Sequence, residues 1–159
     1  MKRIEKILKH PLFLDSLEKN HTAEADRRFC RHNMEHFLSV ARLCYILCLE
    51  EGYPIQKDVV YAAGLLHDIG KHRQYLEQIP HELASAEIAP VILMDCGYTK
   101  EETDTIVSAI RTHRDKSIRE EKSLNGYLYR ADKASRTCYA CKAIADCNWK
   151  EGTQNFSVY

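Results

Sequence analysis

Ala-Gly-Leu-Leu-His-Asp-Ile-Gly-Lys, residues 63–71, ends a strong helical pattern that begins near Ile55 in this 159-residue chain. Before and within it, apolar residues recur three and four positions apart, which is the spacing of one helix face. His67 and Asp68 lie in the last turn of this predicted helix, and Gly70 is placed to end it. Neighbouring residues on a helix point about 100° apart, so both side chains reach a common point only near a helix end.

Helical spacing continues on both sides of this stretch, and no convincing alternating strand is found. We predict further helices over about residues 27–51, 81–96 and 99–113, and one from about residue 123 into a cysteine-rich tail. An N-terminal segment over about residues 2–20 is broken near Pro11, since proline disfavours helix at the residue before it. Thr99 and Glu102 form a capping box. The predicted fold class is all-α, a compact single-domain helical bundle over residues 1–159.

The composition of the chain argues against nucleic-acid duplexes and membranes as partners. Lys plus Arg and Asp plus Glu both total 23, so the chain lacks the basic excess of a general binder of nucleic-acid duplexes. No apolar run approaches the ~20 residues of a membrane span, and the start of the chain is too charged for a secretion signal. We therefore expect a cytoplasmic protein without a membrane partner. Seven cysteines, an odd number, argue against a closed disulfide framework.

Histidines and aspartates lie where the apolar stripe of a predicted helix begins or ends. The candidates are His36, His67, Asp68, His113 and Asp132. Several helices could thus aim imidazoles and carboxylates at one point, and that mixture of ligands suits first-row divalent metal ions. Any one of these histidines alone is more often an ordinary core or surface residue, and spacing by itself does not prove that they converge.

Three runs, in their order along the chain, resemble the HD-domain superfamily. They are Met-Glu-His-Phe-Leu-Ser-Val-Ala-Arg at 34–42, the stretch at 63–71, and Tyr-Arg-Ala-Asp at 129–132. This all-α family of metal-dependent phosphohydrolases has a histidine, a His-Asp pair and a distant aspartate, and these places are taken by His36, His67, Asp68 and Asp132. The motif core covers about residues 27–137, with 1–26 as an N-terminal helical extension and 138–159 as a C-terminal tail.

His32 competes with His36 for the first place, because the two lie one turn apart on the predicted helix. We prefer His36, since the family's histidine usually stands one turn before a Val-Ala pair such as 40–41. His32 is then a substrate-facing residue, a support for a ligand, or a structural residue.

The resemblance also implies a second metal ion. Members with two ions carry further histidines between the doublet and the last aspartate, here His81 and His113, and Asp68 would then bridge both ions. The motif spacing is similar to that of bacterial symmetrical diadenosine-tetraphosphate hydrolases, although the chain departs from them after Asp132. The two ions would be iron, manganese, nickel, cobalt or zinc.

The activity implied is cleavage of a phosphoester or phosphoanhydride bond in a small nucleotide-like molecule by metal-activated water. Asp68 and Lys71 are the expected catalytic residues, and Lys71, His32 and Arg136 are expected to bind the substrate. Three alternatives stay open: a phosphate-binding or nucleotide-binding sensor without turnover, diiron oxygenase-type chemistry, and a helical scaffold stabilised by its metal. The sequence does not indicate an oligomeric state.

The tail carries the pattern Cys138-x2-Cys141-x5-Cys147, which the family resemblance does not explain. On a continuing helix the first two cysteines would be neighbours. Cys30 could supply a fourth thiolate, and four thiolates suit structural zinc or an iron–sulfur cluster. Buried or redox-silent cysteines are the default interpretation, and an additional cysteine-bound metal is the secondary hypothesis.

Overall fold

The computed structural model describes residues 1–147, 149 and 153–158, and among these residues helices are the regular secondary structure and no strand occurs. Eight α-helices follow in chain order: α1 Lys2–Ile7, α2 Pro11–Ala23, α3 Met34–Glu50, α4 Lys57–Leu66, α5 Lys71–Leu76, α6 His81–Asp95, α7 Lys100–Thr112 and α8 Leu124–Ala134. Three 3₁₀ turns accompany them: η1 Lys116–Ile118, η2 Cys138–Ala140 and η3 Ile144–Asp146. The all-α prediction is confirmed. Among these residues no helix is long and apolar enough to cross a membrane.

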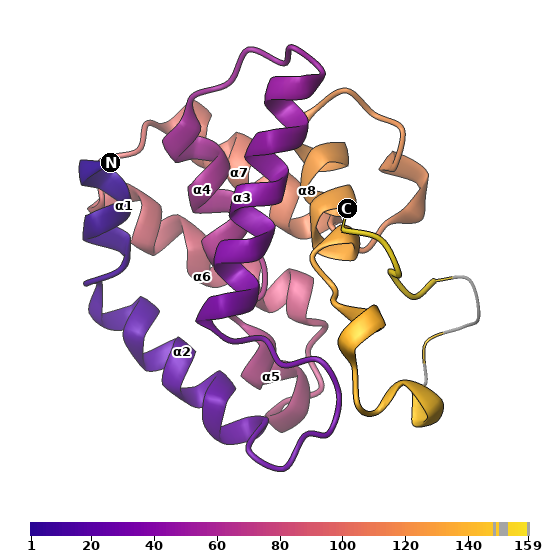
Figure 1. The fold of residues 1–159 in the computed structure, drawn as a ribbon. Coiled ribbons are helices and arrows are strands. Elements are labelled where there is room, and N and C mark those ends of the chain that lie inside the picture. Colours follow the sequence, from indigo (N-terminus) through magenta and orange to yellow (C-terminus); the bar gives the residue numbers. More distant parts are fainter. Residues whose placement is uncertain (148, 150–152, 159) are drawn as a thin grey trace.

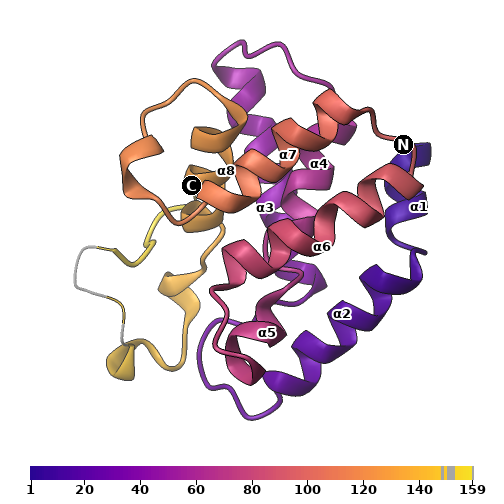
Figure 2. The same cartoon turned by 180° about the vertical axis from the view of Figure 1, so that it is seen from behind.

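Helix α4 lies at the centre of the bundle and is covered by α3, α6, α7 and α8 (Figures 1 and 2). Its side chains from Val59 to Leu66 are buried except for Tyr61, as expected for a helix with neighbours on all sides. Helices α1 and α2 run along the outside of the bundle, and α2 packs against the short α5. The end of α4, which carries the His-Asp doublet, therefore lies deep in the molecule.

Helices α3 and α4 approach each other backbone to backbone. A Cβ atom added at Gly64 would lie 2.5 Å from the Cα atom and 2.7 Å from the backbone nitrogen of Ala41. Only glycine leaves room for this approach. The close packing brings the start of α3 and the end of α4 to the same region of the core.

Helix α3 begins later than predicted, at Met34 rather than near residue 27. The side chain of Asn33 accepts a hydrogen bond from the backbone N–H of His36, at 3.0 Å, and so caps the helix. Residues 24–33 form a loop. The prediction that His32 and His36 share one helix face is therefore wrong, because His32 precedes the helix.

Two other helix ends also differ from the prediction. The pattern through residue 70 breaks after Leu66, and a new short helix, α5, starts at Lys71. Helix α8 ends at Ala134, so the helix predicted from about residue 123 does not continue into the tail: Cys138 begins the separate 3₁₀ turn η2 and Cys141 follows that turn. The capping box is confirmed: the Glu102 N–H donates to Thr99 Oγ1 at 3.2 Å, and the reciprocal bond is 2.9 Å.

Arg3 ties α1 to α4 and α7. Its guanidinium donates to Asp58 at 2.7 Å and to Glu102 at 2.5 and 2.9 Å, and it lies over the Tyr98 ring. Arg3→Met is expected to lower the free energy of unfolding by about 1–2 kcal/mol, because two partly buried carboxylates would lose their charge-assisted hydrogen bonds. Urea unfolding would measure the loss, with the same substitution at the exposed Lys2 as the control.

This contribution should depend on pH. Hydrogen bonds from Arg3 lower the pKa of both Asp58 and Glu102. A carboxylate with a lowered pKa stabilises the fold above its ordinary pKa and ceases to do so as the pH falls through the lowered value. The difference between wild type and Arg3→Met should therefore shrink in acid. An equal difference at neutral and strongly acidic pH would contradict this account.

Candidate metal centre

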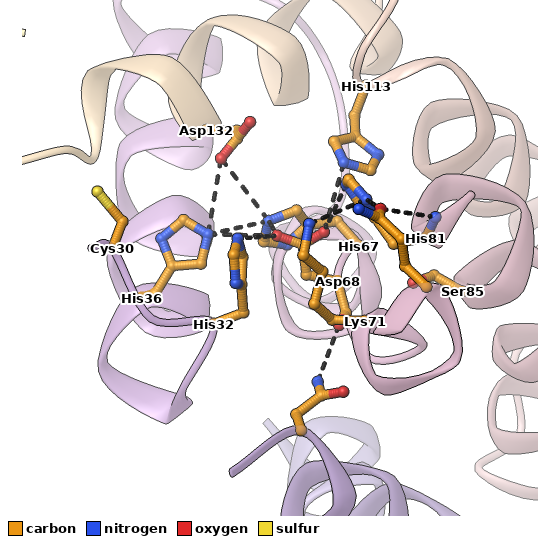
Figure 3. Close-up of polar contacts among 12 residues, drawn as sticks. Cys30, His32, His36, His67, Asp68, Lys71, His81, Ser85, His113 and Asp132 are labelled. Atoms are coloured by element: carbon orange, nitrogen blue, oxygen red, sulfur yellow. Dashed lines mark hydrogen bonds and ion pairs between the residues drawn. The ribbon is translucent and has the colours of Figure 1, made fainter. Parts of the chain in front are cut away.

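The six predicted ligands meet in the core around one carboxylate (Figure 3). Their ligand atoms form two groups, within each of which all atoms lie within 4.8 Å of one another and could hold a metal ion. The first group is His36, His67, Asp68 and Asp132, and the second is Asp68, His81 and His113. Asp68 belongs to both.

The two oxygens of Asp68 face opposite sides of the cluster. Oδ2 lies 3.1 Å from His67 Nε2 and 3.5 Å from His36 Nε2. Oδ1 lies 3.1 Å from His81 Nε2 and 3.6 Å from His113 Nε2. Each oxygen thus serves a different pair of imidazoles. The order of motifs along the chain could not show this division.

The hydrogen bonds behind the histidines set which ring nitrogen points inward. Nδ1 of His67 donates to the Gly64 carbonyl at 2.8 Å, and Nδ1 of His113 donates to the Ile110 carbonyl at 2.6 Å. A carbonyl only accepts, so Nδ1 carries the proton and Nε2 presents a lone pair to the cluster. Asp68 Oδ1 is buried and accepts no hydrogen bond. A buried carboxylate oxygen that lies beside the inward-facing Nε2 atom of His113 and accepts no hydrogen bond fits a divalent cation.

Charge states in the cluster also suit a cation. Burial alone would raise the pKa of Asp68, but the charge of His67 and the other imidazoles hold it well below its usual range. Burial lowers the pKa of His81 to about 2 against the pull of Asp68. Burial would likewise raise the pKa of Asp132, but the charges of Lys133, Arg136 and the neighbouring imidazoles together hold it below its usual range. Burial would lower the pKa of His67, but the charges of Asp68 and Asp132 raise it above its usual value. The ionised carboxylates and the neutral His81 are in the forms that bind metal, and a cation would displace a proton from His67.

Cationic side chains surround the cluster. Lys71 Nζ lies 3.0 Å from His81 Nδ1, Lys133 contacts Asp132, and Arg136 Nη2 lies 3.8 Å from the same carboxylate. Further out, two arginines lie close enough to act on the charge of Lys71: Arg27 and Arg114. We call these five side chains the cationic ring. The structure thus brings the predicted Lys71 and Arg136 to the edge of the site.

His32 lies outside both ligand groups but faces the shared carboxylate, with Nε2 3.7 Å from Asp68 Oδ2. Its ring is held by Glu24, whose Oε1 lies 2.5 Å from Nδ1, and its backbone N–H donates to Glu24 Oε2 at 2.7 Å. The Tyr75 hydroxyl donates to the same carboxylate. Burial would raise the pKa of Glu24, but the hydrogen bonds and charge of His32, together with the hydrogen bond from Tyr75, lower it to about 2.

Sequence reasoning missed Glu24 and two other supporting residues. Asn20 donates to the backbone carbonyl of Asp68 at 3.0 Å and so holds the doublet from α2. Lys133, next to Asp132, was overlooked although its position beside a candidate ligand was a usable signal. No sequence signal pointed to Glu24 or Asn20, because both lie outside the segments that carry the family motifs. They reach the site only through the packing of α2.

Comparison with known proteins identifies the family to which the chain belongs. Residues 33–141 match the model of the HD domain. An uncharacterized protein of Clostridium beijerinckii is 42% identical over 159 residues, which is all of this chain and 99% of that protein. Ribonuclease Y of Lawsonia intracellularis is 32% identical over 60% of this chain, but the match spans only 16% of that enzyme. No solved structure gives a significant match. These relatives lend no support to the finer resemblance to diadenosine-tetraphosphate hydrolases.

Proposed function

The chain belongs to the HD domain family, and on that premise we propose that it is a metal-dependent phosphohydrolase acting on a small nucleotide-like molecule. The bond cleaved is a phosphoester or a phosphoanhydride. One observation carries the proposal: two groups of ligand atoms share Asp68, with one oxygen facing each group. This arrangement is the one a two-ion site requires.

Each residue of the cluster has a separate task in this proposal. Three side chains, from α3, the end of α4 and α8, would hold one ion: His36, His67 and Asp132. His81 and His113 would hold the other, and Asp68 would be a ligand of both. Divalent ions bound at such a site activate water and stabilise the charge that develops in phosphoryl transfer. Iron, manganese, nickel, cobalt and zinc all suit these ligands.

The cationic ring orients the anionic substrate. Lys71 is the innermost cation and is only 7% exposed, so its charge acts in a medium of low polarity. Arg136 stacks on Trp149, with the guanidinium carbon 3.3 Å from the ring centroid, which holds it beside Asp132. His32, positioned by Glu24, faces the same space from the α2–α3 loop. These three side chains are the proposed contacts to substrate phosphate groups.

A substrate panel with metal analysis tests the proposal. Protein purified without added metal would be analysed for bound ions, then assayed for product from nucleotides, dinucleoside polyphosphates, phosphate esters and a short oligoribonucleotide. Diadenosine tetraphosphate belongs in the panel because of the motif spacing, and the oligoribonucleotide because of the ribonuclease Y match. Metal-dependent cleavage of one small-molecule class is the expected result. A fully metallated protein that cleaves nothing would overturn the proposal.

Two other outcomes would select the competing functions. Tight nucleotide binding with no product after long incubation would identify a sensor. Oxygen consumption that depends strictly on iron would identify oxygenase chemistry. Cleavage of the oligoribonucleotide alone would keep the phosphohydrolase activity but reject the small-molecule substrate.

Lys71→Met should lower kcat/KM by about 100-fold, because it removes the innermost cation while keeping a side chain of similar length. The bound metal content should stay unchanged, since Lys71 contacts His81 on the nitrogen that faces away from Asp68. Steady-state kinetics and metal analysis would check both parts. Lys19→Met, at a half-exposed position on α2, is the control. Loss of metal in Lys71→Met would show that the residue supports His81 rather than the substrate.

A further inference from the structure

The seven cysteines fall into two populations. Cys44, Cys48 and Cys96 are buried in the apolar core. The other four lie in two segments outside it: Cys30 in the α2–α3 loop, and Cys138, Cys141 and Cys147 in the tail after α8. None of the seven forms a disulfide. The second population has no packing role comparable to that of the first, and the proposed phosphohydrolase site does not use it.

The loop and the tail lie side by side, although more than 100 residues of chain separate Cys30 from Cys138 (Figures 1 and 2). Arg28 Nη2 lies 2.6 Å from Asp146 Oδ2, which joins the residue two before Cys30 to the residue directly before Cys147. Burial raises the pKa of the Cys30 thiol, and the nearby Cys138 and Cys141 contribute to the same shift. The segment that carries Cys30 therefore lies beside the segment that carries the other three cysteines, and we call this contact the junction.

A backbone turn in the tail brings Cys138 and Cys141 close together in space. The N–H of Cys141 donates to the carbonyl of Cys138 at 3.2 Å, closing the 3₁₀ turn η2 around the Cys-x2-Cys sequence. A second turn, η3, ends at Asp146, whose carboxylate forms the ion pair with Arg28 of the loop. Cys147 is the next residue, so this ion pair holds it near the loop. A Cys-x2-Cys turn is a common way to present two thiolates to one zinc ion.

We propose that Cys30, Cys138, Cys141 and Cys147 bind a structural zinc ion that ties the α2–α3 loop to the tail. Four thiolates make a closed tetrahedral site, which zinc occupies without an open position. The spacing Cys-x2-Cys-x5-Cys differs from the bacterial and plant-type runs that hold iron–sulfur clusters. Arg28 and Arg136 beside the junction would offset the negative charge of the bound thiolates.

The tail needs such a constraint. Of its described residues after Arg136, only Cys138 and Ala143 are buried, and no α-helix forms there. A short segment with so little core gains stability mainly from cross-links or metals. The sulfurs do not reach the mutual 4.8 Å spacing found among the ligand atoms of the histidine–aspartate groups. Zinc binding should therefore draw the turns η2 and η3 toward the loop.

Cobalt substitution separates this site from the histidine–aspartate cluster. Full-length reduced protein would be loaded with Co²⁺, and the sulfur-to-cobalt charge-transfer absorption recorded, because only thiolate ligands produce it. Zinc content would be measured in parallel. Cys30→Ala and Cys141→Ala should each abolish the absorption and lose about one equivalent of zinc per chain. Asp68→Asn should keep the absorption, since it alters only the other site.

Cys96→Ala is the matched control, since it removes a core thiol outside the junction and should leave absorption and zinc content unchanged. Cys30 is exposed, so its variant is expected to fold, which circular dichroism would verify. Three results would each overturn the proposal: no charge-transfer absorption in wild type, absorption that survives both cysteine variants, or a mass showing a disulfide among the four cysteines in freshly isolated protein. Acid-labile sulfide would overturn the assignment to zinc.

Discussion

Asp68→Asn is expected to lower kcat/KM by more than about 100-fold and to empty both ligand groups of metal. The substitution keeps the shape of the side chain and removes its charge, and both oxygens are needed because they face different histidines. Loss of a residue that only hydrogen-bonds to a metal ligand typically costs ~10–100-fold in metal affinity or activity. Loss of a ligand itself should cost more. Kinetics at saturating metal, together with metal content after gel filtration, would measure the effect.

The control is Asp95→Asn, the same change at an exposed aspartate on α6. It should leave both activity and metal content at the wild-type level. Asp68→Asn should still fold, because Asn20 binds its backbone carbonyl rather than its side chain. Retention of one ion and substantial activity in Asp68→Asn would contradict the shared role and indicate two independent sites.

Gly64→Ala is expected to destabilise the fold by about 2–3 kcal/mol, the upper part of the range for overpacking a core. The new methyl group would meet backbone atoms of Ala41 at 2.5 and 2.7 Å, so α3 and α4 must move apart. The helical preference of alanine over glycine, up to about 1 kcal/mol, offsets only part of this. Urea unfolding would give the change in free energy.

The double variant Gly64→Ala with Ala41→Gly tests the cause. Two of the three contacts at Gly64 involve backbone atoms of Ala41, so removing its methyl group should restore little of the lost stability. Full rescue would show that a side-chain clash alone was responsible. Activity should also fall in Gly64→Ala, since the carbonyl of Gly64 holds the ring of His67.

Much of the fold could be predicted because its helices carry their own signals. The capping box at Thr99 and Glu102 marks the start of α7, and Pro11 marks the start of α2. The start of α3 was misplaced because residues 27–33 lack a proline or glycine to stop the pattern. The helix start is set by Asn33, whose side chain caps α3. The prediction missed it because the apolar periodicity continues past this residue.

The identity of the candidate ligands could be predicted because the order of motifs limits the choice. Their geometry could not. The division of Asp68 between two groups depends on how α3, α6, α7 and α8 pack around the end of α4, and the sequence pattern contains no interhelical distance. The same reason hides Glu24, which reaches His32 only because α2 lies against α5. The tail was misread as helix because Cys138 and Cys141 fit helical spacing as well as a turn.

The cationic ring has a consequence for how a substrate arrives. The chain as a whole is formally neutral, so it exerts little attraction on an anion in bulk solution. The charges of the ring act over a short range, because Arg27 and Arg114 lie beside the carboxylates of Glu24 and Glu82 and because physiological salt screens charges over roughly 8 Å. Encounter is then governed by ordinary diffusion, and selection of anions begins only at the mouth of the site. Substrate capture should depend on ionic strength far less than it does in enzymes with a large opposite net charge.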